Sequence, residues 1–121
     1  MKENRTPMAD ADQVRACVSD VARLMDGVDD ESRRKIPDGT LSVRIPDVEL
    51  AFAGRFDGGH LVDVHEVDDV QAGAAKLRLT LSSDDLIDVV AGRLHFGSGW
   101  AHGRIKVEAK FRDLLALRSF L

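Results

Sequence analysis

Residues 75–121 read AKLRLTLSSDDLIDVVAGRLHFGSGWAHGRIKVEAKFRDLLALRSFL and hold the clearest succession of elements in the chain. Their first apolar residues alternate with polar ones, which predicts a strand whose apolar face carries Leu77, Leu79 and Leu81. Ser82 is followed three residues later by Asp85, a spacing that resembles a capping box and predicts the start of a helix. This helix should end at Gly92, because glycine readily takes the left-handed conformation that follows many helices.

The remainder of this stretch predicts a corner, a strand and a second helix. Gly97-Ser98-Gly99-Trp100 is rich in glycine and is typical of a turn. A fifth strand should follow, on which polar residues alternate with Ile105, Val107 and Ala109. The chain then closes on a terminal helix with a wide apolar surface, made of Phe111, Leu114, Leu115, Leu117, Phe120 and Leu121. Because this surface exceeds one narrow stripe, the helix could line a cavity, meet a partner or touch lipid.

The first third of the chain predicts an amphipathic helix over residues 14–28, where apolar residues recur at steps of three and four. Asp10 or Asp12 is expected to cap its start. The charged run Asp29–Lys35 breaks the pattern and predicts a solvated connection. The elements that follow this connection should be strands.

Three strands in a meander are expected next. The first carries Leu41, Val43 and Ile45, and the second, after Pro46, carries Val48, Leu50, Phe52 and Phe56. Asp57-Gly58-Gly59 predicts a tight hairpin, because such turns need residues with positive φ angles. The third strand spans His60–Val67, with Val62 and Val64 expected on one face and Asp63 and His65 on the other. Residues Asp68–Ala74 are small and polar and are expected to form a loop.

Together these elements predict an α+β fold with a single five-stranded, largely antiparallel sheet, covered on one face by helices and wet on the other. Residues 1–121 fit one domain, of which we expect residues 1–8 to be flexible. Any cavity should lie between the sheet and the helices.

Composition narrows the class of protein. The chain is 44% hydrophobic and 31% charged with a net charge of −4, which is ordinary for a globular domain. Its basic residues form no continuous stripe, so nucleic acid is not expected as a partner. A single cysteine, Cys17, cannot form an intramolecular disulfide, and the chain carries no signal-peptide pattern and no apolar run long enough for a membrane span. We therefore expect a cytoplasmic protein with Cys17 in its core.

The pattern of residues 75–121 resembles that of the sterol carrier protein 2 sterol-transfer domain family. The residues that carry the resemblance are Asp84-Asp85-Leu86, Gly92-Arg93-Leu94, Ala101 and Gly103-Arg104-Ile105-Lys106-Val107. The rest of the chain agrees with the family in the order of its elements. The resemblance implies a hydrophobic tunnel between sheet and helices that binds fatty acids, fatty acyl-CoA esters, sterols or similar lipids without catalysis.

The resemblance implies no catalytic residue, no cofactor and no metal. We expect a monomer or weak homodimer that can make transient contact with a membrane. Mapped by position, the apolar residues expected to bind the ligand are Leu50, Phe52, Phe56, Leu79, Leu86, Val89, Val90, Trp100, Ile105, Phe111, Leu114 and Leu117. Each buried methylene of a ligand contributes about 0.8 kcal/mol, so an alkyl chain could bind such a set without a specific polar contact.

Other functions stay open at this point. The same fold without a pocket could serve as an interaction or dimerisation module through its terminal helix. A small enzyme resembling ketosteroid isomerase could use Asp63 as a general base. His102, with Arg93 or Arg104, could meet the carboxylate or phosphate head group of a ligand, although a loop histidine facing solvent is the commoner case.

Overall fold

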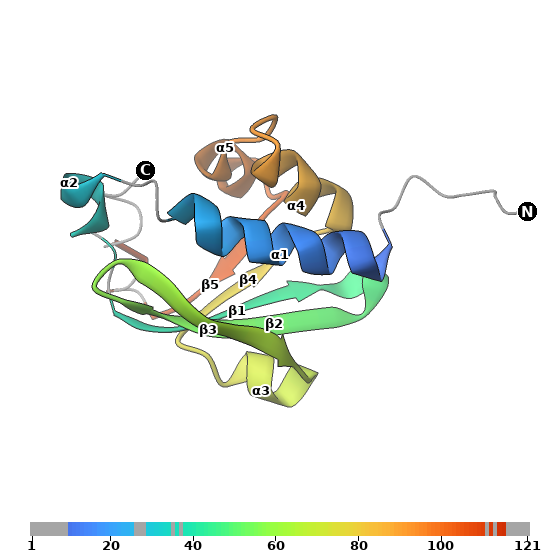
Figure 1. Cartoon of the computed structure of the whole chain (residues 1–121), viewed down its shortest axis with the longest axis horizontal. Helices are drawn as coiled ribbons and strands as arrows, with labels where there is room; N and C mark the ends of the chain where they lie inside the picture. The colour runs from blue at the N-terminus through green and yellow to red at the C-terminus, as the bar shows by residue number, and fades with distance from the viewer. Residues whose placement is uncertain are drawn as a thin grey trace, which may run out of the picture.

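A mixed sheet of five strands runs through the middle of the computed structural model, which describes residues 10–25, 29–34, 36, 38–110, 112, 114 and 115 (Figure 1). The strands are β1 (Gly39–Ile45), β2 (Leu50–Asp57), β3 (His60–Val67), β4 (Leu77–Thr80) and β5 (Lys106–Glu108). Their order in the sheet is β3-β2-β1-β4-β5, in which β1 and β4 are parallel and the other neighbours are antiparallel. The predicted α+β class and the largely antiparallel sheet are confirmed.

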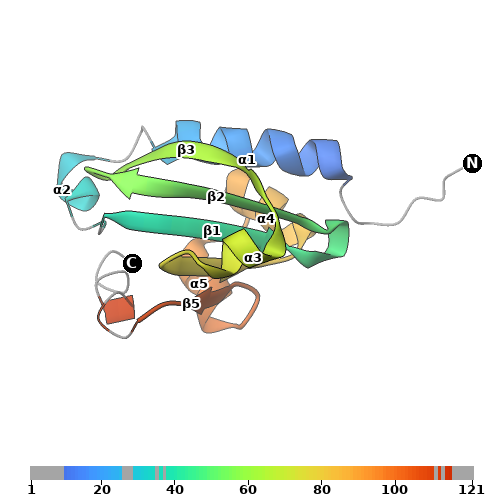
Figure 2. The same ribbon diagram turned by 90° about the horizontal axis from the view of Figure 1, so that it is seen from below.

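Helices lie on both faces of this sheet. The face that carries the core is covered by α1 (Ala11–Met25), α4 (Ser83–Val90) and α5 (Phe96–Ala101), while α3 (Asp69–Gly73) lies against the opposite face (Figures 1 and 2). The short helix α2 (Asp30–Arg33) lies at one end, beside the tip of the β2–β3 hairpin (Figure 1). The core between sheet and helices consists of Val14, Val18, Ile45, Phe52, Leu81, Leu86 and Ile105. Cys17 is half-buried and packs against this core, as expected.

The helix starts and ends follow from local hydrogen bonds. At the start of α1, the Gln13 N–H donates to the Asp10 carboxylate at 2.8 Å, which confirms Asp10 as the cap. At the start of α4, the Asp85 N–H donates to the Ser82 hydroxyl at 3.1 Å. Gly92 has a φ of 81°, and the Arg93 N–H donates to the Asp88 carbonyl at 2.8 Å, the pattern of a Schellman motif. Both predicted ends of α4 are therefore confirmed.

Three segments predicted as connections contain helices. The expected loop Asp68–Ala74 contains α3, which begins with a capping box between Asp68 and Gln71. The Ser42 hydroxyl donates to the Ala72 carbonyl at 2.7 Å, so α3 shields part of the face that we expected to be wet. The expected connection Asp29–Lys35 contains α2, and the expected glycine turn lies within α5.

A bulge in β3 overturns the predicted alternation of that strand. Ala53 pairs with His65 and Arg55 pairs with Val62, so one residue of β2 faces two of β3 at this point. Asp63 takes a left-handed φ of 58° there. The bulge shifts the phase of the strand, and Val62 and Val64 consequently lie on opposite faces of the sheet instead of sharing one.

The predicted terminal helix falls largely outside the described residues. Leu114 is half-buried, and its N–H donates to the Lys110 carbonyl at 3.0 Å, which is a helical bond. The neighbouring Leu115 is 49% exposed. Residues 26–28 of the predicted first helix also lie outside the described residues. The last described residue of α1 is Met25. In the described part of the chain, no helix has the length and apolarity needed to cross a membrane.

Candidate ligand-binding cavity

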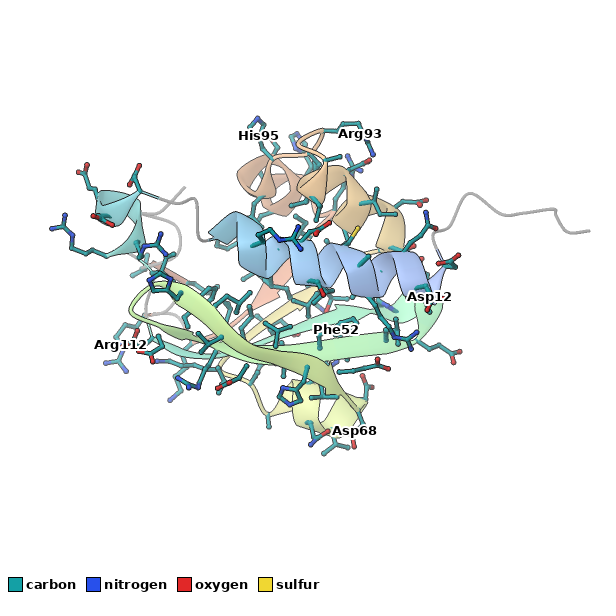
Figure 3. All side chains as sticks on the ribbon, in the orientation of Figure 1. Asp12, Phe52, Asp68, Arg93, His95 and Arg112 are labelled. Atoms are coloured by element: carbon teal, nitrogen blue, oxygen red, sulfur yellow. The ribbon has the colours of Figure 1, made fainter. Side chains whose placement is uncertain are left out.

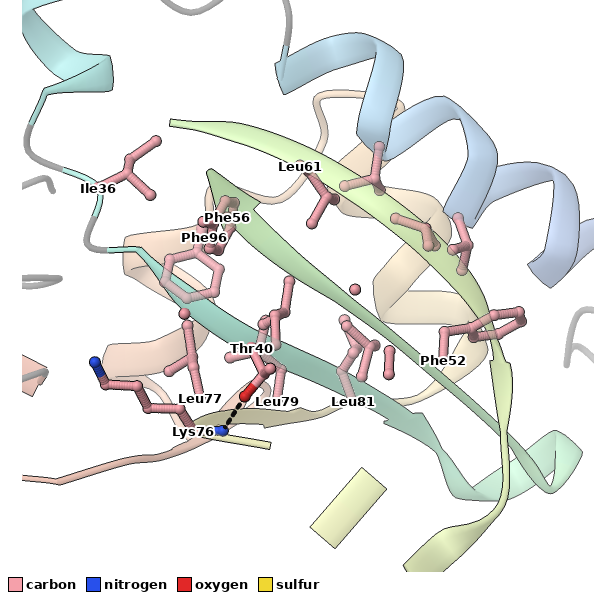
Figure 4. A pocket seen from close by; sticks show the side chains of 18 of the residues that line it. Ile36, Thr40, Phe52, Phe56, Leu61, Lys76, Leu77, Leu79, Leu81 and Phe96 are labelled. Atoms are coloured by element: carbon pink, nitrogen blue, oxygen red, sulfur yellow. Dashed lines mark hydrogen bonds between the residues drawn. The ribbon is translucent and has the colours of Figure 1, made fainter. Parts of the chain in front are cut away.

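A cavity of about 300 Å³ lies between the core face of the sheet and the helices that cover it (Figure 4). Its apolar side chains come from α1, from the strands β1 to β4, from α4, from the first residue of α5, and from Ile36 before β1 and Leu81 after β4. These lining residues are Val18, Val21, Ile36, Leu41, Val43, Phe52, Ala53, Phe56, Leu61, Val64, Leu77, Leu79, Leu81, Leu86, Val89 and Phe96. The lining is thus built from the same amphipathic pattern that defines each element.

The bulge in β3 shapes one wall of this cavity. Leu61 pairs with Phe56 before the bulge, and Val64 follows it, so both side chains reach the cavity even though they are three residues apart. Gly54 lies opposite the bulge, where a Cβ atom would come within 3.1 Å of the Val64 Cγ2 atom and 3.0 Å of the Val62 carbonyl oxygen. The two strands approach so closely here that a larger residue would have to displace its neighbours by a few tenths of an ångström.

Among the described residues, the polar side chains of the lining belong to three residues at one end of the cavity, which are Asp38, Thr40 and Lys76. The Lys76 N–H donates to the Thr40 hydroxyl at 2.8 Å (Figure 4). The Lys76 ammonium lies 3.5 Å from the Asp38 carbonyl oxygen. The Asp38 carboxylate accepts a hydrogen bond from the Gly58 N–H at 3.0 Å. The other described side chains that line the cavity offer a ligand apolar contact.

The short helix α2 packs on the hairpin tip next to this end. The Arg33 guanidinium lies 3.2 Å from the His60 Nδ1 atom and 3.5 Å from the Gly59 carbonyl oxygen. Ile36, which follows α2, is buried and lines the cavity. The contacts of Arg33 therefore hold α2 on the hairpin tip, next to the residue Ile36 that lines the cavity.

The structure brings together five of the twelve residues predicted to bind a ligand, and these five line the cavity: Phe52, Phe56, Leu79, Leu86 and Val89. Leu50 and Val90 instead pack against the core, in which Ile105 is only 2% exposed. The Trp100 ring lies 6.0 Å from that of Phe96 and does not line the cavity. Leu114 also lies outside the lining, and Phe111 and Leu117 lie outside the described residues. Ligand binding by any of the twelve predicted residues stays a prediction.

Several lining residues were not among those predicted. The first-helix pattern already indicated an inward face for Val18 and Val21, and the strand alternation did the same for Leu41, Val43, Leu77 and Leu81. Leu61 was missed because of the bulge, and Val64 was predicted on the core face without being named as a ligand contact. Ile36 and Phe96 carried no signal, because each adjoins a segment predicted to be a solvated connection or a turn.

The polar residues considered for other chemistry do not face the cavity. Asp63 lies in a shallow groove on the α3 side of the sheet and pairs with Arg55 at 2.9 Å. That hydrogen bond, with the charge of the Asp63 carboxylate, raises the pKa of Arg55. A general base at Asp63 would therefore be separated from the apolar cavity by the sheet.

The cationic groups of the predicted head-group site are likewise engaged elsewhere. Arg93 forms an ion pair with Asp88 at 2.9 Å and lies on the outer side of the helical layer (Figure 3). Arg104 forms ion pairs with Asp85 and Asp88, and the hydrogen bond to Asp85 raises the pKa of Arg104. The His102 Nδ1 atom lies 2.8 Å from the Ser98 carbonyl oxygen. Among the residues that the structure describes, no group of three histidine, cysteine or acidic side chains could hold a metal ion.

Several solved structures share this arrangement of strands and helices. The crystal structure of sterol carrier protein 2 aligns over 87% of this chain and 90% of its own, with a TM-score of 0.63 at 14% identity. Palmitated sterol carrier protein 2 like 2 from Aedes aegypti aligns over 92% of each chain, with a TM-score of 0.56 at 16% identity. The fold is therefore the sterol carrier protein 2 fold, as the resemblance of residues 75–121 implied.

The same fold occurs as part of a larger enzyme. The stereoselective inverting sec-alkylsulfatase Pisa1 from a Pseudomonas species aligns over 81% of this chain with a TM-score of 0.55 at 18% identity. The match spans 15% of the length of that sulfatase. No family model matches the sequence of the present chain, and no curated protein matches it either.

Proposed function

We propose that the protein binds and carries hydrophobic ligands with one aliphatic chain, such as a fatty acid or the acyl part of a fatty acyl-CoA ester. The observation that carries the proposal is the cavity of about 300 Å³, in which the polar side chains of the described lining lie at one end. Burial of a ten-carbon chain would contribute about 8 kcal/mol at 0.8 kcal/mol per methylene, before the costs of association are subtracted.

The volume also bears on the kind of lipid. Ligand cavities commonly measure about 300–1,000 Å³, so this cavity lies at the lower limit of that range. A slender chain can fill a small space by adjusting its torsions, whereas a sterol presents a rigid fused-ring body. We therefore favour single-chain lipids over sterols for this protein.

We propose that the protein binds its ligand without catalysing a reaction. The rival enzyme of the ketosteroid isomerase kind would need its base in the apolar cavity, and Asp63 lies on the other face of the sheet. The rival interaction module would not need an apolar cavity, so the cavity favours the carrier. The cytoplasmic location, the monomeric or weakly dimeric state and a transient contact with membranes stay predictions.

Two valines of β3 offer a matched test of the proposed function. Val64→Phe should fill part of the cavity and weaken the binding of a fluorescent fatty acid by about tenfold, because the added ring occupies space that the chain requires. Val62→Phe makes the same change two residues away, on a side chain that does not line the cavity, and should leave the affinity unchanged. Both affinities are measured by fluorescence titration of the purified variants.

Circular dichroism spectra and unfolding curves of the two variants would show that each retains its fold. Equal loss of affinity in both variants would contradict binding in this cavity. Absence of any fatty acid binding by the unmodified protein would overturn the carrier function itself.

A further inference from the structure

We infer that the bulge at Asp63 makes the cavity selective for unbranched alkyl chains, because it brings Leu61 and Val64 together over Gly54 and narrows the cavity there. This inference rests on the proposed function and adds to it the element that determines which alkyl chains fit. The chemical class is a straight alkyl chain, in preference to an isomer that carries methyl branches.

The bulge adds one residue that the pairing of β2 with β3 does not require. The ladder is regular up to the pair of Ala53 with His65 and again from the pair of Arg55 with Val62, so Gly54 faces both Asp63 and Val64. Without Asp63, Val64 would lie directly opposite Gly54 in a continuous ladder. Directly opposed residues share a face of the sheet, so Val64 would still face the cavity. The inward pattern of the strand therefore does not depend on the extra residue.

The extra residue takes a conformation that favours glycine, yet several contacts hold it. Asp63 has a φ of 58°, in the left-handed region where bulges of this kind usually carry glycine. Its carboxylate pairs with Arg55 of the neighbouring strand at 2.9 Å, and its carbonyl oxygen lies 2.7 Å from the His65 Nδ1 atom. A strained residue that its surroundings hold in this way is a candidate for a functional role.

On the cavity side, the bulge makes two side chains converge on one glycine. A Cβ atom on Gly54 would come within 3.1 Å of the Val64 Cγ2 atom and 3.4 Å of the Leu61 Cδ1 atom. In a regular ladder, successive inward residues of one strand are about 7 Å apart, and the residue diagonal to Gly54 would lie at a similar distance from it. Leu61 and Val64 therefore lie closer together over Gly54 than a regular strand would place them.

The space above Gly54 is bounded on its other sides as well. Phe52 and Phe56 flank Gly54 on β2 and line the cavity (Figure 4), and Leu41 is its partner on β1. A straight chain can pass between these side chains, whereas a methyl branch at this point would overlap one of them. One methylene group too many or too few in an apolar pocket changes affinity about 10–200-fold.

The test compares decanoate with its branched isomer dimethyloctanoate, because the two acids have the same composition and the same head group. Isothermal titration calorimetry of the whole chain gives the ratio of their dissociation constants. The unmodified protein should bind decanoate about tenfold more tightly than the branched acid. Deletion of Asp63 should lower this ratio to about twofold, because Leu61 and Val64 then separate to the spacing of a regular strand.

Asp63→Gly is the matched control, because glycine keeps the left-handed conformation and removes only the carboxylate. The ratio should stay at about tenfold in this variant. Val64→Ala retains the bulge and removes one of the two converging side chains, so it should lower the ratio to about threefold. This variant tests the narrowing even if the deletion prevents folding, which circular dichroism spectra would show.

Equal affinity of the unmodified protein for the two acids would overturn this inference and leave the carrier function intact. An unchanged ratio in Val64→Ala, or in a folded deletion variant, would have the same meaning. Loss of the ratio in Asp63→Gly would assign the selectivity to the carboxylate and also overturn the inference. Failure of both acids to bind the unmodified protein would overturn the carrier function and this inference with it.

Discussion

Replacement of Ile45 by alanine is expected to lower the free energy of unfolding by about 2–5 kcal/mol, the usual cost of a large-to-small substitution in a packed core. Ile45 is fully buried, belongs to the core cluster and does not line the cavity. Loss of its side chain would therefore leave a new void that the surrounding helices and strands cannot fill.

Leu79→Ala is the control for this prediction. Leu79 is half-buried and already borders the cavity, so its removal enlarges an existing space. Removal of its side chain breaks fewer packing contacts. We therefore expect the free energy of unfolding to fall by about 1 kcal/mol, which is below the range for a fully packed site. Urea unfolding of both variants measures the difference. A Leu79→Ala variant that is destabilised as much as Ile45→Ala would mean that the space beside Leu79 is a packed core.

The second large effect is expected at Gly59. Gly58 and Gly59 have φ angles of 61° and 84°, as a two-residue hairpin turn of type I′ requires. A Cβ atom on Gly59 would come within 1.9 Å of the Arg33 Cγ atom and 2.7 Å of the Arg33 carbonyl oxygen. Gly59→Ala must therefore displace α2, in addition to the roughly 1–2 kcal/mol that a left-handed alanine costs. We expect a total loss of about 3 kcal/mol.

Gly58→Ala separates the two contributions. A Cβ atom on Gly58 would meet no other atom within 4 Å, so this variant should show only the backbone cost, about 1–2 kcal/mol. Denaturant unfolding gives both values, and faster release of a bound fatty acid by Gly59→Ala would show that α2 helps to close the cavity beside Ile36. Equal destabilisation by the two substitutions would contradict the packing of Arg33 on the hairpin tip.

Local patterns were sufficient to predict much of this fold. The alternation of β1 and β4, the hairpin at Gly58-Gly59 and the start and end of α4 each depend on residues close together in sequence, and each was predicted. The helix α3 had a local signal as well, because Asp68 and Gln71 have the spacing of a capping box. Its small residues Ala72 and Gly73 nevertheless suggested a loop.

Long-range packing explains the features that the sequence did not predict. The left-handed conformation of Asp63 has no glycine to indicate it, and it depends on the pairing of two strands. Gly99 suggested a turn, but it lies within α5 and packs closely against Ile105, since a Cβ atom on Gly99 would lie 2.8 Å from the Ile105 Cδ1 atom. The glycine therefore serves tertiary contact and not a change of chain direction.

The same distinction limits what could be predicted about the cavity. Leu79 and Ile105 both lie on apolar strand faces, and the sequence treats them alike. In the structure Leu79 borders the cavity, whereas Ile105 packs against its neighbours in the core. Whether an inward side chain meets a void depends on the spacing of the sheet and the helices, which no local pattern encodes.

The most direct test of the carrier account is a nuclear Overhauser measurement between decanoate and the methyl groups of the isotopically labelled protein. We predict contacts from the alkyl chain to the methyl groups of Val43, Val64 and Leu79, and none to those of Val62 or the exposed Val70. Contacts confined to Val62, Val70 or other surface methyl groups, with none in the cavity, would contradict the account.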